Sequence, residues 1–222
     1  TNMRNMFNVA TNFNQPLDWD TSSVENMSFM FSGATIFNNG DQPLDWNTGS
    51  VTNMRNMFNV ATNFNQPLDS WDTGNVTTMN FMFNRAESFI QDISAWNTRL
   101  VTDMEGMFKN ARSFNQDIRT KEVTVDHITY TAWDTGRVEN MSSMFEGATK
   151  FNNGEQPLNW NVSSVKNMTN MFKDATSFNQ PLNWETENSQ QKSKNITLIL
   201  GIILGSVIMI SITIFLIIKL RK

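Results

Sequence analysis

The chain repeats one phrase along most of its length, and this repetition constrains the fold more than any other feature. Residues 1–18 and 52–69 carry the same eighteen letters, TNMRNMFNVATNFNQPLD. Tryptophan recurs at Trp19, Trp46, Trp71, Trp96, Trp133, Trp160 and Trp184, at spacings of 27, 25, 25, 37, 27 and 24 residues. Residues 1–184 therefore contain seven units of about 24–27 residues, one of them enlarged by an insert. A fixed period in this range is typical of repeat architectures.

Each unit contains a spacing that predicts a short helix. In the second unit Met27, Met30, Phe31 and Ala34 stand at offsets of 0, 3, 4 and 7, which is one stripe of a helix. Asn26, one place before the first Met, is a candidate N-cap. The same four residue types recur at these offsets in all seven units.

A short strand is predicted after each helix. Residues 17–19, Leu-Asp-Trp, alternate as a strand does, and Pro16 suits the first residue of such a strand. In the third unit the gap from Leu68 to Trp71 is one residue longer, and the fourth unit has the same gap. This slip either turns the tryptophan to the opposite face or is absorbed by a bulge. Both alternatives are open from sequence.

One unit of this length cannot bury its own apolar face, whereas stacked units bury a continuous core. Full burial of a Met or Phe side chain contributes roughly 1.5–3 kcal/mol. The predicted fold of residues 1–184 is an α/β solenoid, a leucine-rich-repeat-like stack of seven units with a short strand and a short helix each. One C-terminal transmembrane helix is predicted to follow it.

The repeated order V-T-N-M-x-x-M-F-x-x-A-x-x-F-N-Q-P-L-x-W-D-T-S resembles the BspA-like leucine-rich-repeat surface proteins of bacteria. It is closest to the branch whose units contain W-D-T-S-x-V-T-N-M and F-N-Q-P-L, and the resemblance covers residues 1–184. It implies a leucine-rich-repeat-like solenoid displayed outside the cell, with adhesive or host-contact roles in some members. It supplies no catalytic residues.

The composition changes abruptly after the repeats. Residues 185–195 are polar and are predicted to form a flexible stalk. Residues 196–218 contain 23 residues without a charge, about 34 Å of helix, which is enough to cross a membrane. A buried core helix is the alternative. Gly201 and Gly205 have the spacing of a helix-dimer motif and predict a weak homodimer.

The last four residues, 219–222, form a basic tail. They supply three predicted stop-transfer charges, Lys219, Arg221 and Lys222. Lys192 and Lys194 on the other flank weaken this bias. The resulting prediction is a single-pass protein of the cell membrane, with the repeats outside and the C-terminus in the cytoplasm.

Charge and composition exclude several classes of partner and site. Residues 1–194 carry 14 Lys and Arg against 21 Asp and Glu, so 14 − 21 gives −7. An acidic body argues against nucleic acid, which needs a basic surface. The chain has no Cys, so it has no disulfide framework and no Cys-based metal site or nucleophile. No cofactor is predicted.

An insert at residues 119–131, RTKEVTVDHITYT, interrupts the fifth unit. Its alternating apolar residues predict a small hairpin that projects from the stack. Long loops on repeat arrays often carry binding, so the candidate binding residues are Val123, Val125, Asp126, His127, Ile128 and Tyr130. The alternative is a tolerated insertion without a role. His127 is the chain's one histidine and has no ligand partners nearby, so it does not predict a metal site.

Two sets of polar residues recur in register. The Asp or Asn after each Trp predicts either a calcium ladder or a series of Asx-turns, and the mixture of Asn and Asp favours the turns. The Asn of F-N-Q predicts a hydrogen-bonded ladder that Ile90 interrupts in one unit.

The predicted function is that of a membrane-anchored surface repeat protein for adhesion or macromolecular binding. Its partner would be an extracellular protein or glycan. The alternative is a structural or antigen-display coat without a specific ligand. Catalysis is not predicted, because no nucleophile has a base to pair with, and a hydrolase would depend on His127.

Overall fold

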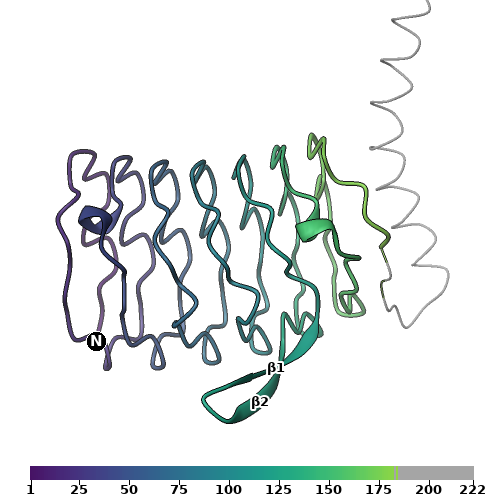
Figure 1. Ribbon diagram of the computed structural model, residues 1–222, viewed down its shortest axis with the longest axis horizontal. Coiled ribbons are helices and arrows are strands. Elements are labelled where there is room, and N and C mark those ends of the chain that lie inside the picture. Colours follow the sequence, from purple (N-terminus) through teal and green to yellow (C-terminus); the bar gives the residue numbers. More distant parts are fainter. Residues whose placement is uncertain (183, 185–222) are drawn as a thin grey trace, which may run out of the picture.

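The computed structural model describes residues 1–182 and Trp184 (Figure 1). Regular secondary structure is sparse in this part of the chain. It comprises two short 3-10 turns, η1 (Asn39–Asp41) and η2 (Asn153–Glu155), and one hairpin of strands β1 (Lys121–Val125) and β2 (Ile128–Ala132). Turns, isolated β-bridges and irregular segments make up the rest of the described residues.

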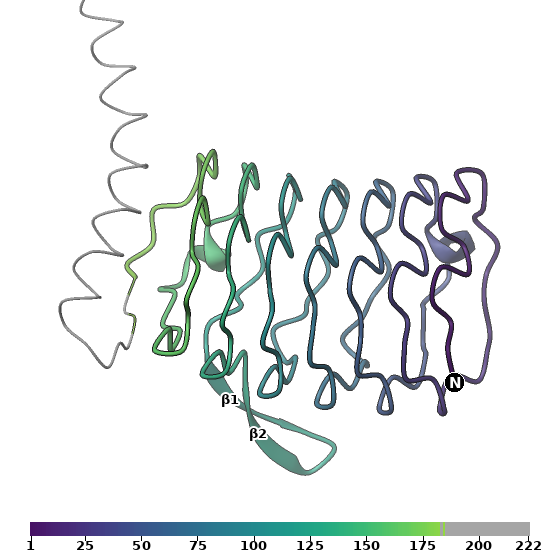
Figure 2. The same ribbon diagram turned by 180° about the vertical axis from the view of Figure 1, so that it is seen from behind.

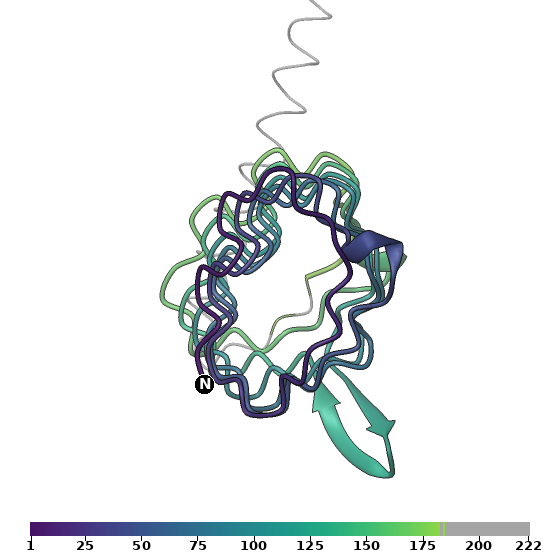
Figure 3. The same ribbon diagram turned by 90° about the vertical axis from the view of Figure 1, so that its left-hand side faces the viewer.

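The chain winds into a row of coils that lie side by side (Figures 1 and 2) and nearly superimpose when viewed along the row (Figure 3). Coils 1 to 7 comprise residues 1–23, 24–50, 51–75, 76–100, 101–137, 138–164 and 165–182. Parallel β-bridges join the same position of successive coils, at Asn2, Asn26, Asn53, Thr78, Asp103, Asn140 and Asn167. Neighbouring coils therefore meet in register.

The predicted helix of each coil is absent, and a run of tight turns takes its place. In coil 2 the N–H of Met30 donates to the carbonyl of Met27, three residues earlier (3.2 Å). The N–H of Phe31, which a helix would also bond to Met27, donates instead to the carbonyl of Met57 in coil 3 (2.9 Å). Every second N–H of residues 27–33 bonds to coil 3 in this way. We call this segment of each coil the turn ribbon.

Left-handed residues explain why the ribbon is not a helix. Phe29 (φ 58°) and Gly33 (φ 73°) have the left-handed backbone conformation, which ends a right-handed helix. Every coil has two such residues at the corresponding places: Asn5 and Val9, Phe29 and Gly33, Asn56 and Val60, Phe81 and Arg85, Gly106 and Asn110, Ser143 and Gly147, Asn170 and Asp174. Isolated short helices are marginal in water, whereas bonds between coils are available at every repeat.

The prediction of an α/β solenoid with a helix in each unit is therefore wrong. The stripe of Met27, Met30, Phe31 and Ala34 is fully buried, but it marks the inner side of a turn ribbon. The predicted N-cap, Asn26, starts that ribbon: its Oδ1 accepts the N–H of Ser28 at 2.9 Å, and no helix follows.

The core consists of columns of like side chains. Phe31 stacks on Phe58 of the next coil with ring centroids 5.6 Å apart, and on Phe37 of its own coil at 3.9 Å. Trp46 and Trp71 stack at 6.5 Å. Because each copy packs against copies of itself, the repeated text fits the same environment in successive coils.

In residues 1–182 the predicted strand before Trp does not form either, apart from an isolated parallel β-bridge between Leu158 and Leu182. In coil 2 Leu44 and Trp46 are both buried, but the N–H of Trp46 bonds within its own coil to the carbonyl of Leu44 (2.9 Å). The extra residue of coil 3 is taken up by a turn in which the N–H of Trp71 donates to the carbonyl of Leu68 (3.2 Å). Trp71 remains buried, and its indole Nε1 donates to the Leu44 carbonyl at 2.9 Å. The longer gap therefore does not turn this tryptophan outward.

The two polar series bond in different ways: the Asp or Asn after each Trp bonds within its own coil, and the Asn ladder joins neighbouring coils. The Asx-turns after Trp are confirmed at Asp20, Asn47, Asp72, Asn97, Asp134 and Asn161, each of which accepts the N–H two residues later. The predicted Asn ladder is also confirmed. Oδ1 of Asn14 accepts the N–H of Asn38 (2.6 Å), Asn38 accepts that of Asn65 (2.8 Å), and Asn65 accepts that of Ile90 (3.0 Å). Ile90 has no side-chain acceptor with which to continue it.

An ion-pair cluster joins coils 5, 6 and 7. Glu146 accepts hydrogen bonds from Lys109 (2.8 Å) and Lys173 (3.3 Å), and its side chain is 15% exposed. Burial raises the pKa of Glu146, but the hydrogen bonds from Lys109, Ser143 and Lys173 outweigh it, so the pKa lies below its ordinary value.

The predicted membrane helix receives no support. In residues 1–182 and Trp184 no helix is long and apolar enough to cross a membrane, because the backbone bonds from coil to coil instead of forming helices. The tail predictions themselves fall on residues that the structure does not describe: the stalk 185–195, the span 196–218, Gly201 and Gly205, and the stop-transfer residues Lys219, Arg221 and Lys222. The prediction of a single-pass protein of the cell membrane, with the repeats outside, is contradicted by the lack of such a helix in residues 1–182 and Trp184.

Candidate binding cleft beneath the hairpin

The insert of coil 5 forms the predicted hairpin. β1 and β2 pair antiparallel, with Val123 opposite Tyr130 and Val125 opposite Ile128. The connecting residues Asp126 (φ 48°) and His127 (φ 67°) are both left-handed, the combination that a tight two-residue hairpin turn requires. The prediction of a hairpin in this insert is confirmed. Figure 1 shows it below the row of coils, leaning toward the lower-numbered coils.

The hairpin has one apolar and one polar face, because directly paired residues share a face. Thr124 and Thr129 lie on the polar face, with their hydroxyl oxygens 2.9 Å apart. Val123 and Tyr130 lie on the apolar face near the base and pack against the core. Val125 and Ile128 lie on the same face nearer the tip, where they are 40% and 66% exposed.

Hydrogen bonds fix the base of the hairpin to the coils on both sides. The Tyr130 hydroxyl donates to the carbonyl of Ala95 in coil 4 at 2.6 Å. Thr120 donates its N–H to Oδ1 of Asn159 in coil 6 at 2.9 Å, and its hydroxyl donates to the carbonyl of Trp133 at 2.8 Å. The hairpin is thereby held at a defined angle to the stack.

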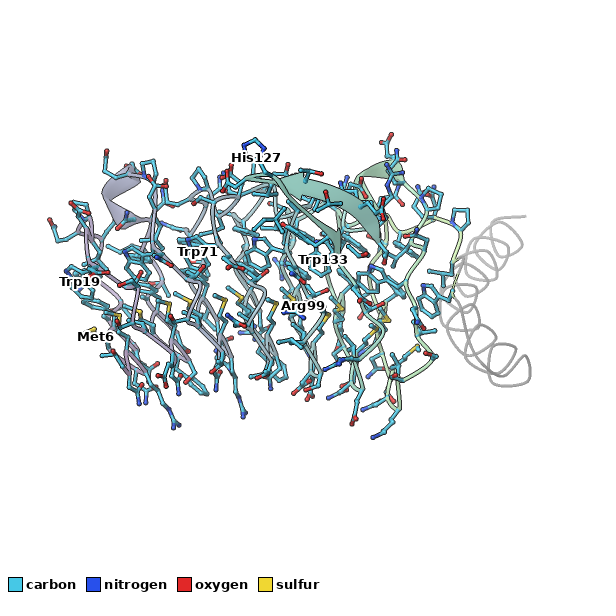
Figure 4. All side chains as sticks on the ribbon, turned by 90° about the horizontal axis from the view of Figure 1, so that it is seen from below. Met6, Trp19, Trp71, Arg99, His127 and Trp133 are labelled. Carbon is cyan, nitrogen blue, oxygen red and sulfur yellow. The ribbon has the colours of Figure 1, made fainter. Side chains whose placement is uncertain are left out.

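A cleft of about 300 Å³ lies between the apolar face of the hairpin and coils 3 and 4. The coils contribute Asp69, Ser70, Trp71, Asp72, Thr73, Gly74, Asn75, Asn97 and Arg99, and the hairpin contributes Val125, Asp126, Ile128 and Tyr130. Figure 4 shows Trp71 and Arg99 in the coils and His127 at the outer edge of the molecule. The cleft combines an apolar overhang with a polar floor.

Four charged side chains line the cleft. Asp69, Asp72 and Asp126 against Arg99 give a net charge of −2 for its walls, and none of the four forms an ion pair with another described residue. Burial raises the pKa of the Tyr130 hydroxyl, and the negative charge of Asp72 raises it further.

Four of the six predicted binding residues line the cleft in the structure, and two do not. Val125, Asp126, Ile128 and Tyr130 line the cleft, whereas Val123 packs at the base and His127 does not line the cleft. In the described part of the chain, no group of three or more His, Cys, Asp or Glu side chains is arranged to hold a metal ion.

The coil residues of the cleft were missed from sequence. A signal for part of them exists in the longer Leu-to-Trp gap of coil 3, because the extra residue makes Asp69 and Ser70 a turn on the outside of the coil. That turn forms part of the cleft wall. Arg99 carries no such signal, since only the packing of the coils brings it near the hairpin.

A family model described as "Mycoplasma protein of unknown function, DUF285" matches residues 1–45, 39–131 and 127–197. The chain belongs to this family. The second DUF285 match ends at residue 131 and the third begins at residue 127, so the two together cover the hairpin. No curated protein and no solved structure matches the chain. The resemblance to BspA-like proteins stays a prediction, because the DUF285 match does not bear on it.

Proposed function

We propose that this DUF285 protein binds another macromolecule through the cleft beneath its hairpin. The observation that carries the proposal is the exposed apolar pair at the tip. The described residues include six exposed large apolar side chains: Met6, Val9, Ile36, Ile90, Val125 and Ile128. Val125 and Ile128 alone among them are paired across two strands, and they border a cleft. Exposed apolar surface rimmed by polar groups is typical of interaction sites.

The different packing of the coils and of the hairpin supports the same proposal. The coils carry the aromatic columns, whereas only the base of the hairpin packs against that core. A rigid array that holds a projecting loop is a common way to build a binding surface. His127 does not line the cleft, so the hydrolase alternative that depends on this residue gains no support.

The chain offers its own template for a test. Replacing residues 119–132 with Asp-Ser restores the Ile-x-x-Trp spacing that coil 4 has from Ile93 to Trp96, and should leave the stack folded. We expect the unmodified protein to bind members of a protein array or a glycan array, and the hairpin-less variant to lose those partners. Equal binding by both proteins, or binding by neither, would refute the proposal and favour a structural coat without a ligand.

A further inference from the structure

We infer that the cleft takes a cationic side chain, Lys or Arg, which a partner protein presents beside an apolar residue. This inference rests on the proposed function and names the class of ligand. It follows from three properties of the cleft: its charge, its apolar overhang and the state of its aromatic groups.

The charge favours a cation. Asp69, Asp72 and Asp126 line the walls with Arg99 as the one opposing charge, and none of these groups is neutralised by an ion pair in the described part of the chain. The field of several unpaired carboxylates that share a cleft attracts positive ligands. An acidic peptide would instead meet net repulsion.

The apolar overhang favours a long side chain with a methylene stem. Val125 and Ile128 line the same cleft as the carboxylates, and 40% and 66% of their surface is exposed. Lys and Arg lay their methylene stems on apolar surface while the charged head stays among polar groups. A cleft of about 300 Å³ accommodates such a side chain together with a small apolar neighbour.

The aromatic groups argue against a sugar. Carbohydrate sites stack sugar rings on exposed aromatic faces and offer free hydroxyl or N–H groups to them. Here Trp71 is only 4% exposed, and its indole N–H is donated to the Leu44 carbonyl. The Tyr130 hydroxyl is likewise donated to Ala95. Besides these aromatic groups the walls carry carboxylates, amides, the Ser70 hydroxyl, one guanidinium group and aliphatic side chains, so the lack of an exposed tryptophan face among the lining residues is what disfavours a sugar.

The single tyrosine of the chain makes the cleft directly observable. Incorporation of 3-fluorotyrosine places one ¹⁹F nucleus at Tyr130, on the cleft wall. The full chain is titrated with the peptides acetyl-KVKVKV-amide, acetyl-KSKSKS-amide and acetyl-EVEVEV-amide, and with chitotetraose as a neutral oligosaccharide. We expect the KVKVKV peptide to shift the resonance at the lowest concentration, the KSKSKS peptide to bind more weakly, and the other two to leave it unchanged.

Substitutions at the cleft give matched controls. Asp72→Asn keeps the Asx-turn, because Asn47 and Asn97 form it in the neighbouring coils, yet it should weaken the KVKVKV peptide about two- to fivefold. Asp69→Asn should do the same, and Arg99→Gln should strengthen binding by a similar factor. Raising the salt concentration should weaken binding.

The outcomes separate this inference from the proposed function. A shift caused by chitotetraose or by the EVEVEV peptide at comparable concentrations would overturn the cationic ligand and leave the cleft as a binding site. The absence of a shift with all four probes would overturn the inference as well, while the array comparison with the hairpin-less variant still decides the proposed function. Unchanged affinity in both Asp variants would also overturn it.

Discussion

Met6 and Met57 permit a direct test of coil stacking, because they occupy the same place in two identical segments. Met57 is 0% exposed between coils 2 and 4, whereas Met6 in coil 1 is 55% exposed. Replacing a buried Met with Ala costs about 2–5 kcal/mol, through lost transfer free energy and the cavity left behind. Met6 buries less than half of its surface, so its loss should cost about 0.7–1.4 kcal/mol, scaled from about 1.5–3 kcal/mol for full burial.

The variants M6A and M57A have the same composition and the same neighbours in sequence, so differences in intrinsic propensity cancel. Urea unfolding followed by tryptophan fluorescence gives the two free energies of unfolding. We expect M57A to be the less stable by about 0.6 kcal/mol or more, the difference between the two ranges. Because neighbouring coils stabilise one another, the midpoint for M57A should shift for the whole array. Equal losses in the two variants would refute the stacking account, since identical segments would then contribute equally whether or not a coil lies on each side.

Three further predictions concern single polar groups. Ile90→Asn should stabilise the protein by about 0.5–1.5 kcal/mol in urea unfolding, because the new Oδ1 would accept the N–H of Asn115 and continue the ladder; Ile90→Ser, with a shorter side chain, should not. Glu146→Gln should lower the free energy of unfolding by up to about 1 kcal/mol at pH 7. Because the pKa of Glu146 in the folded protein is lowered from 4.5, this difference between the variant and the unmodified protein should vanish as the pH falls through the folded pKa. A difference that persists in acid would contradict the stabilising ion pairs. Ultraviolet titration of the single tyrosine should place the pKa of Tyr130 above 10, and Asp72→Asn should lower that pKa. Because the tyrosine ionises at a lower pH in the unfolded chain, the free energy of unfolding should fall as the pH rises beyond 10. A titration midpoint at or below 10 would refute the raised pKa.

The sequence by itself predicted the features that depend on local residue patterns. The period, the inward stripe that includes Met27 and Phe31, the Asx-turn at Asp72 and the hairpin in the insert each depend on residue types and spacings within one unit. A residue such as Ile90 was also predictable as a break in the ladder, because only an amide or carboxylate side chain offers the acceptor. These features could be predicted because the contacts that determine them lie within one unit or repeat identically between neighbouring units.

The predictions of a helix and a strand in each unit were wrong. The spacing of apolar residues indicates which side chains point inward, but it does not indicate to which carbonyl each N–H donates. The N–H of Phe31 has an acceptor four residues back in a helix and another in the next coil, at Met57, and the sequence of one unit suits both. Only the stacked structure decides between them, since the second acceptor exists only when a neighbour lies alongside. The cleft depends on the same fact: Asp69 and Arg99 line it together with the hairpin because the consecutive coils 3, 4 and 5 lie side by side in space (Figure 1).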